Sequence, residues 1–391
     1  MTLAENPEKV GFSAERLKRI DEMLLRHIRE HRLMGSVTLV ARQGQPVHFA
    51  ANGFQDAETK QPMTINTRFR LASSSKPITA AAVLLLVEEG LVRLSDPVAR
   101  FLPEFAESKV AVERHGSIEL VPAERPITVH DLLTHTGGLA SDGLGAKQVP
   151  PENLEPHGQD TLATYAKRLA KVPLDFPPGS QWRYSGIAGF DVLAHIIEIA
   201  SGQSFDAFLH ERIFAPLGMS DTTFVHQPED DGDDIASVYR QSDKAGKKMQ
   251  KIESGLRFPK GYYSGAGGLI STAPDFFRFL QLLANGGELE GTRLLSPRTV
   301  ELLSANHVGA LYREGLGFGL GVEVVLDSAR ADTFRSVGSH TWYGAFGTYA
   351  WVDPKEQLVS ILLQQSPLTS MVEGILRDFE TAVMQALVVL S

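Results

Sequence analysis

The chain has 391 residues, of which 43% are hydrophobic and 22% charged, values typical of a globular protein with one large domain or two interlocked ones. Its net charge of −9 comes without any run of lysines and arginines, so we expect no nucleic-acid partner. The chain contains no cysteine, which excludes disulfides, thiolate metal sites and a cysteine nucleophile.

The N-terminal segment, residues 1–24, carries charges throughout, where a signal peptide has an uninterrupted apolar core of about 7 to 15 residues. Nothing later in the chain approaches the roughly 20 consecutive apolar residues of a membrane-spanning helix. We therefore expect a soluble, cytoplasmic protein that does not contact a membrane.

The first elements are a helix and a hairpin. Ser13 can cap a helix, and apolar residues recur after it at helical spacing. Two strand patterns follow, and we expect them to be joined between Gly44 and Pro46.

The other end of the chain repeats this arrangement in reverse order. Two strand patterns flank a turn at Asp353 and Pro354, and a helical pattern covers residues 371–390. We expect the two chain ends to share one antiparallel sheet in an α/β domain, built from residues 1–72 and 336–391.

The middle of the chain is richer in helical patterns and in loops with proline and glycine. Four segments carry apolar residues at helical spacing: residues 128–139, 191–202, 205–219 and 273–287. We expect residues 73–335 to form a mainly helical domain inserted into the α/β domain. The acidic run from Glu229 to Asp234 lacks the full EF-hand spacing, so we interpret it as a solvated turn and not as a calcium site.

The segment "FRLASSSKP" contains a candidate nucleophile. Pro77 is tolerated only near a helix start, so a helix must begin close to Ser73. Ser73 and Lys76 are three residues apart, which places both side chains on one face of the first turn. The positive end of the helix would favour an alkoxide, and burial would favour the neutral amine that accepts its proton. The alternative is that the serines cap the helix while Lys76 reaches to water.

Two further segments carry candidate site residues. "FPPGSQWRYSG" places Tyr184 in a turn before an apolar helical run, where it could also simply pack against the helix. "VGSHTWYGAFG" presents glycines and aromatics at a strand near the C-terminus. Glycines there let an acyl group approach the backbone, as an oxyanion site requires, although a bulge or a bend would also explain them.

These three segments resemble the motifs of the serine β-lactamase and penicillin-binding-protein superfamily, in particular its class C-like family VIII carboxylesterases. The resemblance covers nearly the whole chain, because "LLTHTGGL", "PLGMSDTTF" and "GAGGLISTAPDFFRFL" also occur in the order that this family uses. It implies a β-lactamase-like α/β fold, with an antiparallel sheet flanked by terminal helices and an inserted helical domain. The active site would lie at the junction of the two domains.

The resemblance also implies roles for individual residues. Ser73 would be the nucleophile, with Lys76 and Tyr184 relaying its proton. The backbone N–H groups of Ser73 and Ala345 would hold the oxyanion. The residues that would contact the substrate are Trp342, Tyr343, Gly344, Phe346 and Gly186, of which the three aromatic ones could equally belong to the core.

Two departures from the family pattern bear on the substrate. Gly186 stands where the family has asparagine, and "WYG" from Trp342 stands where β-lactamases have Lys-Thr-Gly. A register using His340 and Thr341 would restore only a partly protonated imidazole. Both departures favour neutral esters over β-lactams.

We therefore predict a serine hydrolase that cleaves short-chain or compact carboxylic esters through an acyl-enzyme on Ser73. The alternatives are a β-lactamase or D-amino-acid peptidase or amidase, and an acyltransferase on the same scaffold. The sequence has no G-x-S-x-G elbow and no phosphate-binding loop, and His130 and His135 lack H-E-x-x-H spacing, so we expect no metal and no cofactor. His135 would support the site from the loop behind it.

Overall fold

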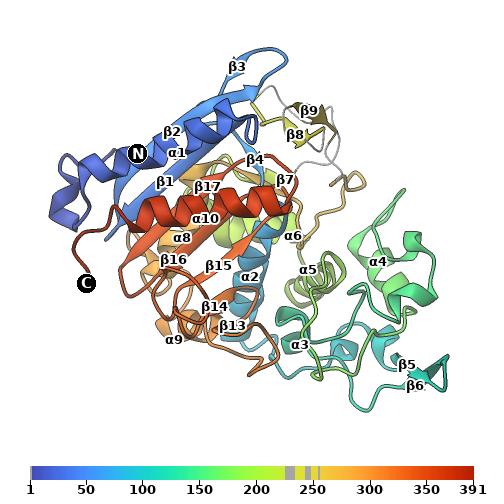
Figure 1. Cartoon of the computed structure of the whole chain (residues 1–391). Coiled ribbons are helices and arrows are strands. Elements are labelled where there is room, and N and C mark those ends of the chain that lie inside the picture. Colours follow the sequence, from blue (N-terminus) through green and yellow to red (C-terminus); the bar gives the residue numbers. More distant parts are fainter. Residues whose placement is uncertain (1, 225–233, 243–247, 254–255) are drawn as a thin grey trace.

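The computed structural model describes residues 2–224, 234–242, 248–253 and 256–391 (Figure 1). Most of the acidic run predicted to be a solvated turn lies outside these residues. Its last member, Asp234, is described and pairs with Arg68 at 2.7 Å. Within the described part of the chain, no helix is both long and apolar enough to cross a membrane. The same part contains no group of three or more histidine, aspartate and glutamate side chains that could hold a metal ion.

The two chain ends form one antiparallel sheet, as the sequence predicted. Its strand order is β13-β14-β15-β16-β17-β1-β2-β3, so β1 from the N-terminal end pairs directly with β17 from the C-terminal end. The strands are β13 (Leu316–Phe318), β14 (Glu323–Val325), β15 (His340–Tyr343), β16 (Tyr349–Asp353), β17 (Leu358–Leu363), β1 (Gly35–Arg42), β2 (Gln45–Asp56) and β3 (Gln61–Pro62).

The hairpin between β1 and β2 turns one residue earlier than predicted. Gln43 and Gly44 both have positive φ angles, of 55° and 73°, which is the geometry of a two-residue hairpin turn. Pro46 is therefore already part of β2, where it faces Ala41 beside a shift in register. A proline fits there because the bulge interrupts the ladder of hydrogen bonds.

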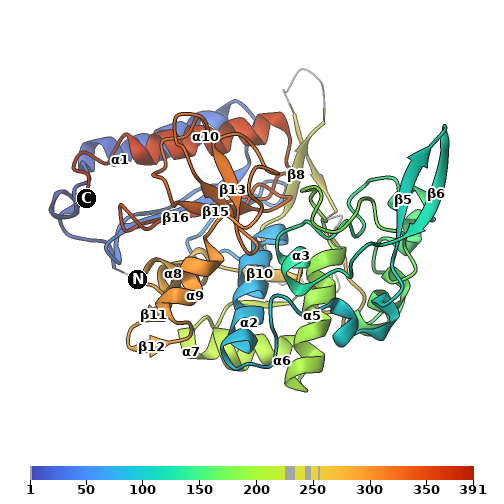
Figure 2. The same ribbon diagram turned by 90° about the horizontal axis from the view of Figure 1, so that it is seen from below.

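Helices from both chain ends cover one face of this sheet (Figures 1 and 2). Ser13 caps α1 (Ala14–Arg29) as expected, and α1 lies against α10 (Ser370–Met384). A buried cluster of apolar side chains joins the two helices to the sheet and includes Leu24, Trp351 and Phe379. The terminal segments thus form a unit with its own core.

The α/β part draws on more of the chain than the predicted boundary at residue 336 allowed. Strands β13 and β14 lie before that boundary and yet belong to the sheet. Helix α8 (Ala273–Ala284) packs on the opposite face from α1 and α10, against β1, β16 and β17. The predicted boundary at residue 336 was therefore wrong. It could not be placed from the sequence, because neither a three-residue strand nor a single apolar helix indicates which sheet it joins. The division into two domains stays a prediction.

The remaining chain is mainly helical, and α5 lies at its centre, in contact with α2, α3, α4 and α6. The helices are α2 (Lys76–Glu88), α3 (Val129–Leu133), α4 (Leu162–Leu169), α5 (Ala188–Ser201), α6 (Phe205–Leu209), α7 (Ala215–Leu217) and α9 (Pro297–Leu303). The short strands are β4 (Phe69–Arg70), β7 (Thr223–Phe224) and β10 (Leu269–Ser271) in one sheet, with the pairs β5 (Lys109–Arg114) and β6 (Ser117–Pro122), β8 (Val238–Gln241) and β9 (Met249–Ile252), and β11 (Glu288–Leu289) and β12 (Thr292–Arg293).

Candidate active site

The three consecutive serines lie in a tight turn that leads into α2. Residues Ala72–Ser75 form a 3-10 turn, and α2 begins at Lys76 with Pro77 in its first turn, as predicted. Ala72 has a φ of +48°, a left-handed conformation that costs a non-glycine residue about 1 kcal/mol or more. The surrounding contacts therefore impose the backbone shape that presents Ser73.

None of the three serine hydroxyls caps α2, so the capping alternative was wrong. The N-cap position, Ser75, makes no side-chain capping hydrogen bond, and its hydroxyl accepts instead from the N–H of Leu269 at 3.4 Å. The hydroxyl of Ser74 contacts that of Thr348 at 3.0 Å. Ser74 and Ser75 are fully buried, whereas Ser73 is partly exposed. Of the three, Ser73 is thus the one that a substrate can reach.

Lys76 is fully buried and points back at Ser73. Its Nζ lies 3.1 Å from Ser73 Oγ, 2.7 Å from the carbonyl oxygen of Gly186 and 2.9 Å from that of Ala266. A neutral amine has two N–H groups and one lone pair, so the two carbonyls can take both N–H groups and leave the lone pair directed at the serine. The alternative in which Lys76 reaches to water was wrong.

Tyr184 completes the contacts of the nucleophile. Its hydroxyl lies 2.7 Å from Ser73 Oγ, on a segment that approaches from the loop before α5. The Nζ of Lys76 also lies 5.0 Å from the centre of the Tyr184 ring. The structure therefore brings the three predicted catalytic residues together around one oxygen atom.

His135 holds the Tyr184 segment in place, as the sequence analysis expected. Its carbonyl oxygen accepts the N–H of Arg183 at 3.1 Å, and its Nδ1 accepts the N–H of Ser185 at 3.3 Å. The imidazole packs edge-on against the Tyr184 ring at 4.8 Å between centroids. Burial, together with the proximity of the ionisable Lys76, lowers the pKa of His135 well below its usual range, so the ring is neutral and its proton lies on Nε2.

The segment after β15 lies against the turn that carries the nucleophile. Thr348 Oγ1 donates to the carbonyl of Leu71 at 2.9 Å, and Gly344 packs so closely there that a Cβ atom would lie 2.3 Å from the same carbonyl oxygen. This contact places the segment of Gly344 and Ala345 against the turn of residues Ala72–Ser75. Neither the Ser73 N–H nor the Ala345 N–H has an acceptor among the residues that the structure describes, so both are available to an oxyanion.

Replacing Gly344 by alanine should damage the site through the backbone. The added methyl group would meet Leu71 O and Thr348 Oγ1, at 2.3 and 2.2 Å, and must push the Ala345 segment away from Ser73. We expect a loss of roughly 1–3 kcal/mol in stability and of about 10²-fold in turnover, measured by chemical unfolding and ester hydrolysis.

Gly374→Ala is the matched control, because a Cβ at that position in α10 meets nothing within 4 Å. This control should keep full turnover and gain up to about 1 kcal/mol in stability. Normal turnover in Gly344→Ala would show that the strand segment does not shape the site.

The predicted substrate-contacting residues have different surroundings. Trp342 lies 5.3 Å from the Tyr184 ring and stacks on the half-buried Tyr343, so both border the site. Phe346 is buried in a small cluster with Ala72 and Val238, as its alternative core assignment proposed. Gly186 is exposed, its carbonyl binds Lys76, and a Cβ there would meet nothing within 4 Å.

The alternative register through His340 and Thr341 was wrong. His340 is buried inside β15 and pairs with Val352 of β16 and Val324 of β14. Burial lowers its pKa to about 4, so the imidazole is neutral at pH 7 and supplies no cation. The end of β15 that approaches the nucleophile carries Trp342 and Tyr343, and Gly344 follows it.

Asp191 is a residue that the sequence analysis missed. It is a fully buried carboxylate on α5, and the Tyr262 and Ser264 hydroxyls and the Ala266 N–H donate to it. Burial raises its pKa to about 6, although these donors and Lys76 oppose the rise. The signal in the sequence was an acidic residue in the first, apolar turn of α5, and it does not identify the partner.

Comparisons with known proteins agree with this geometry. A family model described as Beta-lactamase matches residues 20–382. Esterase EstB from Burkholderia gladioli is 36% identical over 365 residues, which cover 88% of this chain and 89% of that protein. A putative D-alanyl-D-alanine carboxypeptidase from Escherichia coli (strain K12) is 26% identical over 93% of this chain and 85% of its own.

The solved structures give the same result. EstCE1, described as a hydrolase with promiscuous acyltransferase activity, superimposes with a TM-score of 0.81 at 27% identity and covers 95% of this chain and 99% of its own. The fold and the resemblance inferred from the motifs are thereby confirmed. Since the family model spans nearly the whole sequence, the chain belongs to the Beta-lactamase family.

Proposed function

We propose that this protein is a serine carboxylesterase that cleaves short-chain or compact esters through an acyl-enzyme on Ser73. The observation that carries the proposal is the surroundings of one atom. Ser73 Oγ is partly exposed, caps no helix, and lies 3.1 Å from Lys76 Nζ and 2.7 Å from the Tyr184 hydroxyl. The similarity of the chain to esterase EstB also supports ester hydrolysis.

In the acylation step, Ser73 Oγ attacks the ester carbonyl carbon while its proton passes to Lys76, directly or through Tyr184. The tetrahedral intermediate places its negative oxygen toward the N–H groups of Ser73 and Ala345. The C–O bond to the alcohol then breaks, and the alcohol leaves with the proton that the relay holds. Water attacks the acyl-enzyme in the second half of the reaction, and the same groups take and return its proton.

The site suits neutral esters better than β-lactams. Trp342 stands where β-lactamases place the lysine of Lys-Thr-Gly, and Gly186 offers no side-chain amide beside Lys76. His340 does not replace the lysine, because it is buried and neutral. These differences favour the esterase over a β-lactamase or a D-amino-acid peptidase or amidase.

An acyltransferase is the second candidate, supported by the acyltransferase activity described for EstCE1. The acyl-enzyme is common to both reactions, and they differ only in whether water or another alcohol attacks it. Adding an alcohol such as methanol during turnover would separate them by the yield of the new ester.

The test of the proposal is labelling with a fluorophosphonate followed by intact-mass and peptide mapping, beside turnover of p-nitrophenyl acetate, p-nitrophenyl butyrate and nitrocefin. We expect one label, on Ser73, and faster turnover of the two esters than of nitrocefin. A label elsewhere, or faster turnover of nitrocefin, would overturn the proposal.

A further inference from the structure

The loop that holds Lys76 is itself fixed by a buried carboxylate. The carbonyl oxygen of Ala266 accepts from Lys76 at 2.9 Å, while the N–H of the same residue donates to Asp191 Oδ1 at 3.0 Å. Ser264 donates to that oxygen at 2.7 Å, and Tyr262 donates to Asp191 Oδ2 at 2.6 Å. Asp191 and Lys76 therefore bind the two sides of one peptide segment.

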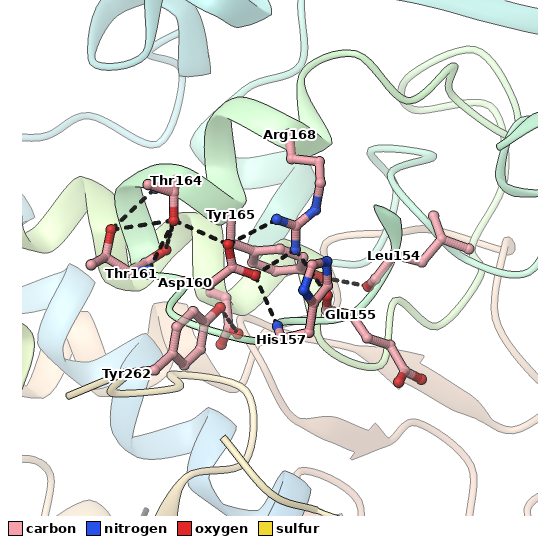
Figure 3. A network of polar contacts seen from close by, with 10 residues as sticks. Leu154, Glu155, His157, Asp160, Thr161, Thr164, Tyr165, Arg168 and Tyr262 are labelled. Carbon is pink, nitrogen blue, oxygen red and sulfur yellow. Dashed lines mark hydrogen bonds and ion pairs between the residues drawn. The ribbon is translucent and has the colours of Figure 1, made fainter. Parts of the chain in front are cut away.

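Asp191 is well separated from solvent. It is 1% exposed, and the ring of Tyr262 that reaches it is packed at 6.1 Å from the ring of Tyr165 on α4. Figure 3 shows Tyr262 beside the polar network of α4, in which Arg168 forms a two-bond ion pair with Asp160. Since Arg168 is paired with Asp160, it does not balance the charge of Asp191 on that side.

The ionisable group on α2 that interacts electrostatically with Asp191 is Lys76, which becomes positively charged when it takes the proton of Ser73. On α3, Asp131 is paired with Arg125, and on α6, Asp206 interacts with Tyr263. His135, which also interacts electrostatically with Lys76, is neutral. Tyr165 and Tyr262 have raised pKa values because of burial and of Asp191, so both stay protonated.

We propose that Asp191 is a positioning residue of the proton relay, which fixes the Ser264–Ala266 segment for Lys76 and stabilises the positive charge that Lys76 acquires from Ser73. It acts through the Ala266 peptide and through its charge, without touching the substrate. The inference rests on Ser73 being the nucleophile of the proposed function. Such a role would explain why α5 carries a buried carboxylate, since burying an aliphatic side chain at that position would cost less free energy.

The first test is the rate at which a fluorophosphonate labels Ser73 between pH 5 and pH 9, followed by intact mass in wild type and Asp191→Asn. In this reaction the Ser73 oxygen bonds to phosphorus, fluoride leaves, and the serine proton passes to Lys76, so no ester substrate is needed. Above pH 7, where Asp191 is ionised, we expect wild type to react roughly 10- to 100-fold faster than the variant.

The dependence of this ratio on pH separates a charge effect from a packing effect. Protonation of Asp191, whose pKa is about 6, removes the charge from wild type, so the two rates should converge towards pH 5. A ratio that stays constant across the range would mean that the asparagine merely disturbs the fold around it. Equal rates at every pH would also overturn the proposal.

Two more variants make the test specific. Tyr262→Phe removes one hydrogen-bond donor to the Asp191 carboxylate and should raise the pKa of that group. The labelling rate of this variant should therefore change at a higher pH than that of wild type. Asp275→Asn is the matched control, since Asp275 is also a buried carboxylate with a raised pKa and accepts from Thr222, but it does not contact the Lys76 loop. Asp275→Asn should react like wild type at every pH. A pH response in Asp275→Asn equal to that of Asp191→Asn would contradict a specific role for Asp191.

Stability and labelling distinguish the possible failures. The folded pKa of Asp191 is raised above 3.8, so its ionisation costs stability as the pH rises through this range, and Asp191→Asn should melt no lower than wild type at pH 8. If wild type is not labelled at Ser73, the proposed function fails. If wild type is labelled and Asp191→Asn follows the same pH profile, only the present inference fails.

Discussion

Ser73→Ala should lose turnover of p-nitrophenyl acetate by roughly 10⁴-fold or more while keeping the melting temperature of wild type. The loss follows because, among the residues that the structure describes, no other serine or threonine hydroxyl contacts both Lys76 Nζ and the Tyr184 hydroxyl. The fold should survive because Ser73 is partly exposed and Lys76 keeps its two carbonyl partners, Gly186 and Ala266. Initial rates and thermal unfolding of the purified variant measure both effects.

Ser75→Ala is the control for this variant. Its hydroxyl is fully buried and makes one long hydrogen bond, to the N–H of Leu269 at 3.4 Å, so the variant should lose at most about 1 kcal/mol in stability and keep its turnover. Hydrolysis of esters by Ser73→Ala at the wild-type rate would disprove the mechanism. Equal loss in both variants would point to damage of the turn and not to a missing nucleophile.

The fold could be predicted from the sequence where elements are long and periodic. The pattern after Ser13 and the strands around Asp353 identified the terminal sheet and its covering helices, because alternation and helical spacing are local properties. Strands β13 and β14 were missed because three residues in a glycine-rich stretch carry no periodic signal, and their pairing with β15 is decided by tertiary contacts.

The catalytic residues of the candidate site could be predicted from the sequence, but the residues that hold them in place could not. The spacing of Ser73 and Lys76 fixes their proximity within one turn, and the resemblance identified Tyr184. The Ala266 carbonyl lies 190 positions from Lys76, and Asp191 meets Tyr262 across 71 positions. Contacts between such distant parts of the chain follow from the packing of α2, α5 and the loop before β10, which no local pattern reveals.

Lys76→Met and Tyr184→Phe should each lower turnover by about 10²- to 10⁴-fold, the usual contribution of a positioned proton-transfer group. Methionine fills much of the buried space of Lys76 but supplies neither a lone pair for the serine proton nor donors for Gly186 and Ala266. Lys76→Arg should not restore activity, because a guanidinium stays protonated and its planar shape does not fit the positions of Ser73 Oγ and the two carbonyl oxygens.

The double variant tests whether the two residues act as one relay. Lys76 Nζ and the Tyr184 hydroxyl both contact the same Ser73 oxygen, so removing either one interrupts the path of a single proton. We therefore expect the double variant, Lys76→Met with Tyr184→Phe, to turn over about as slowly as the less active of the two single variants. A double-mutant cycle on kcat measures this. Losses that multiply would mean that the two groups act in separate steps. In that case Lys76 would serve acylation by Ser73, and Tyr184 would serve the later attack of water.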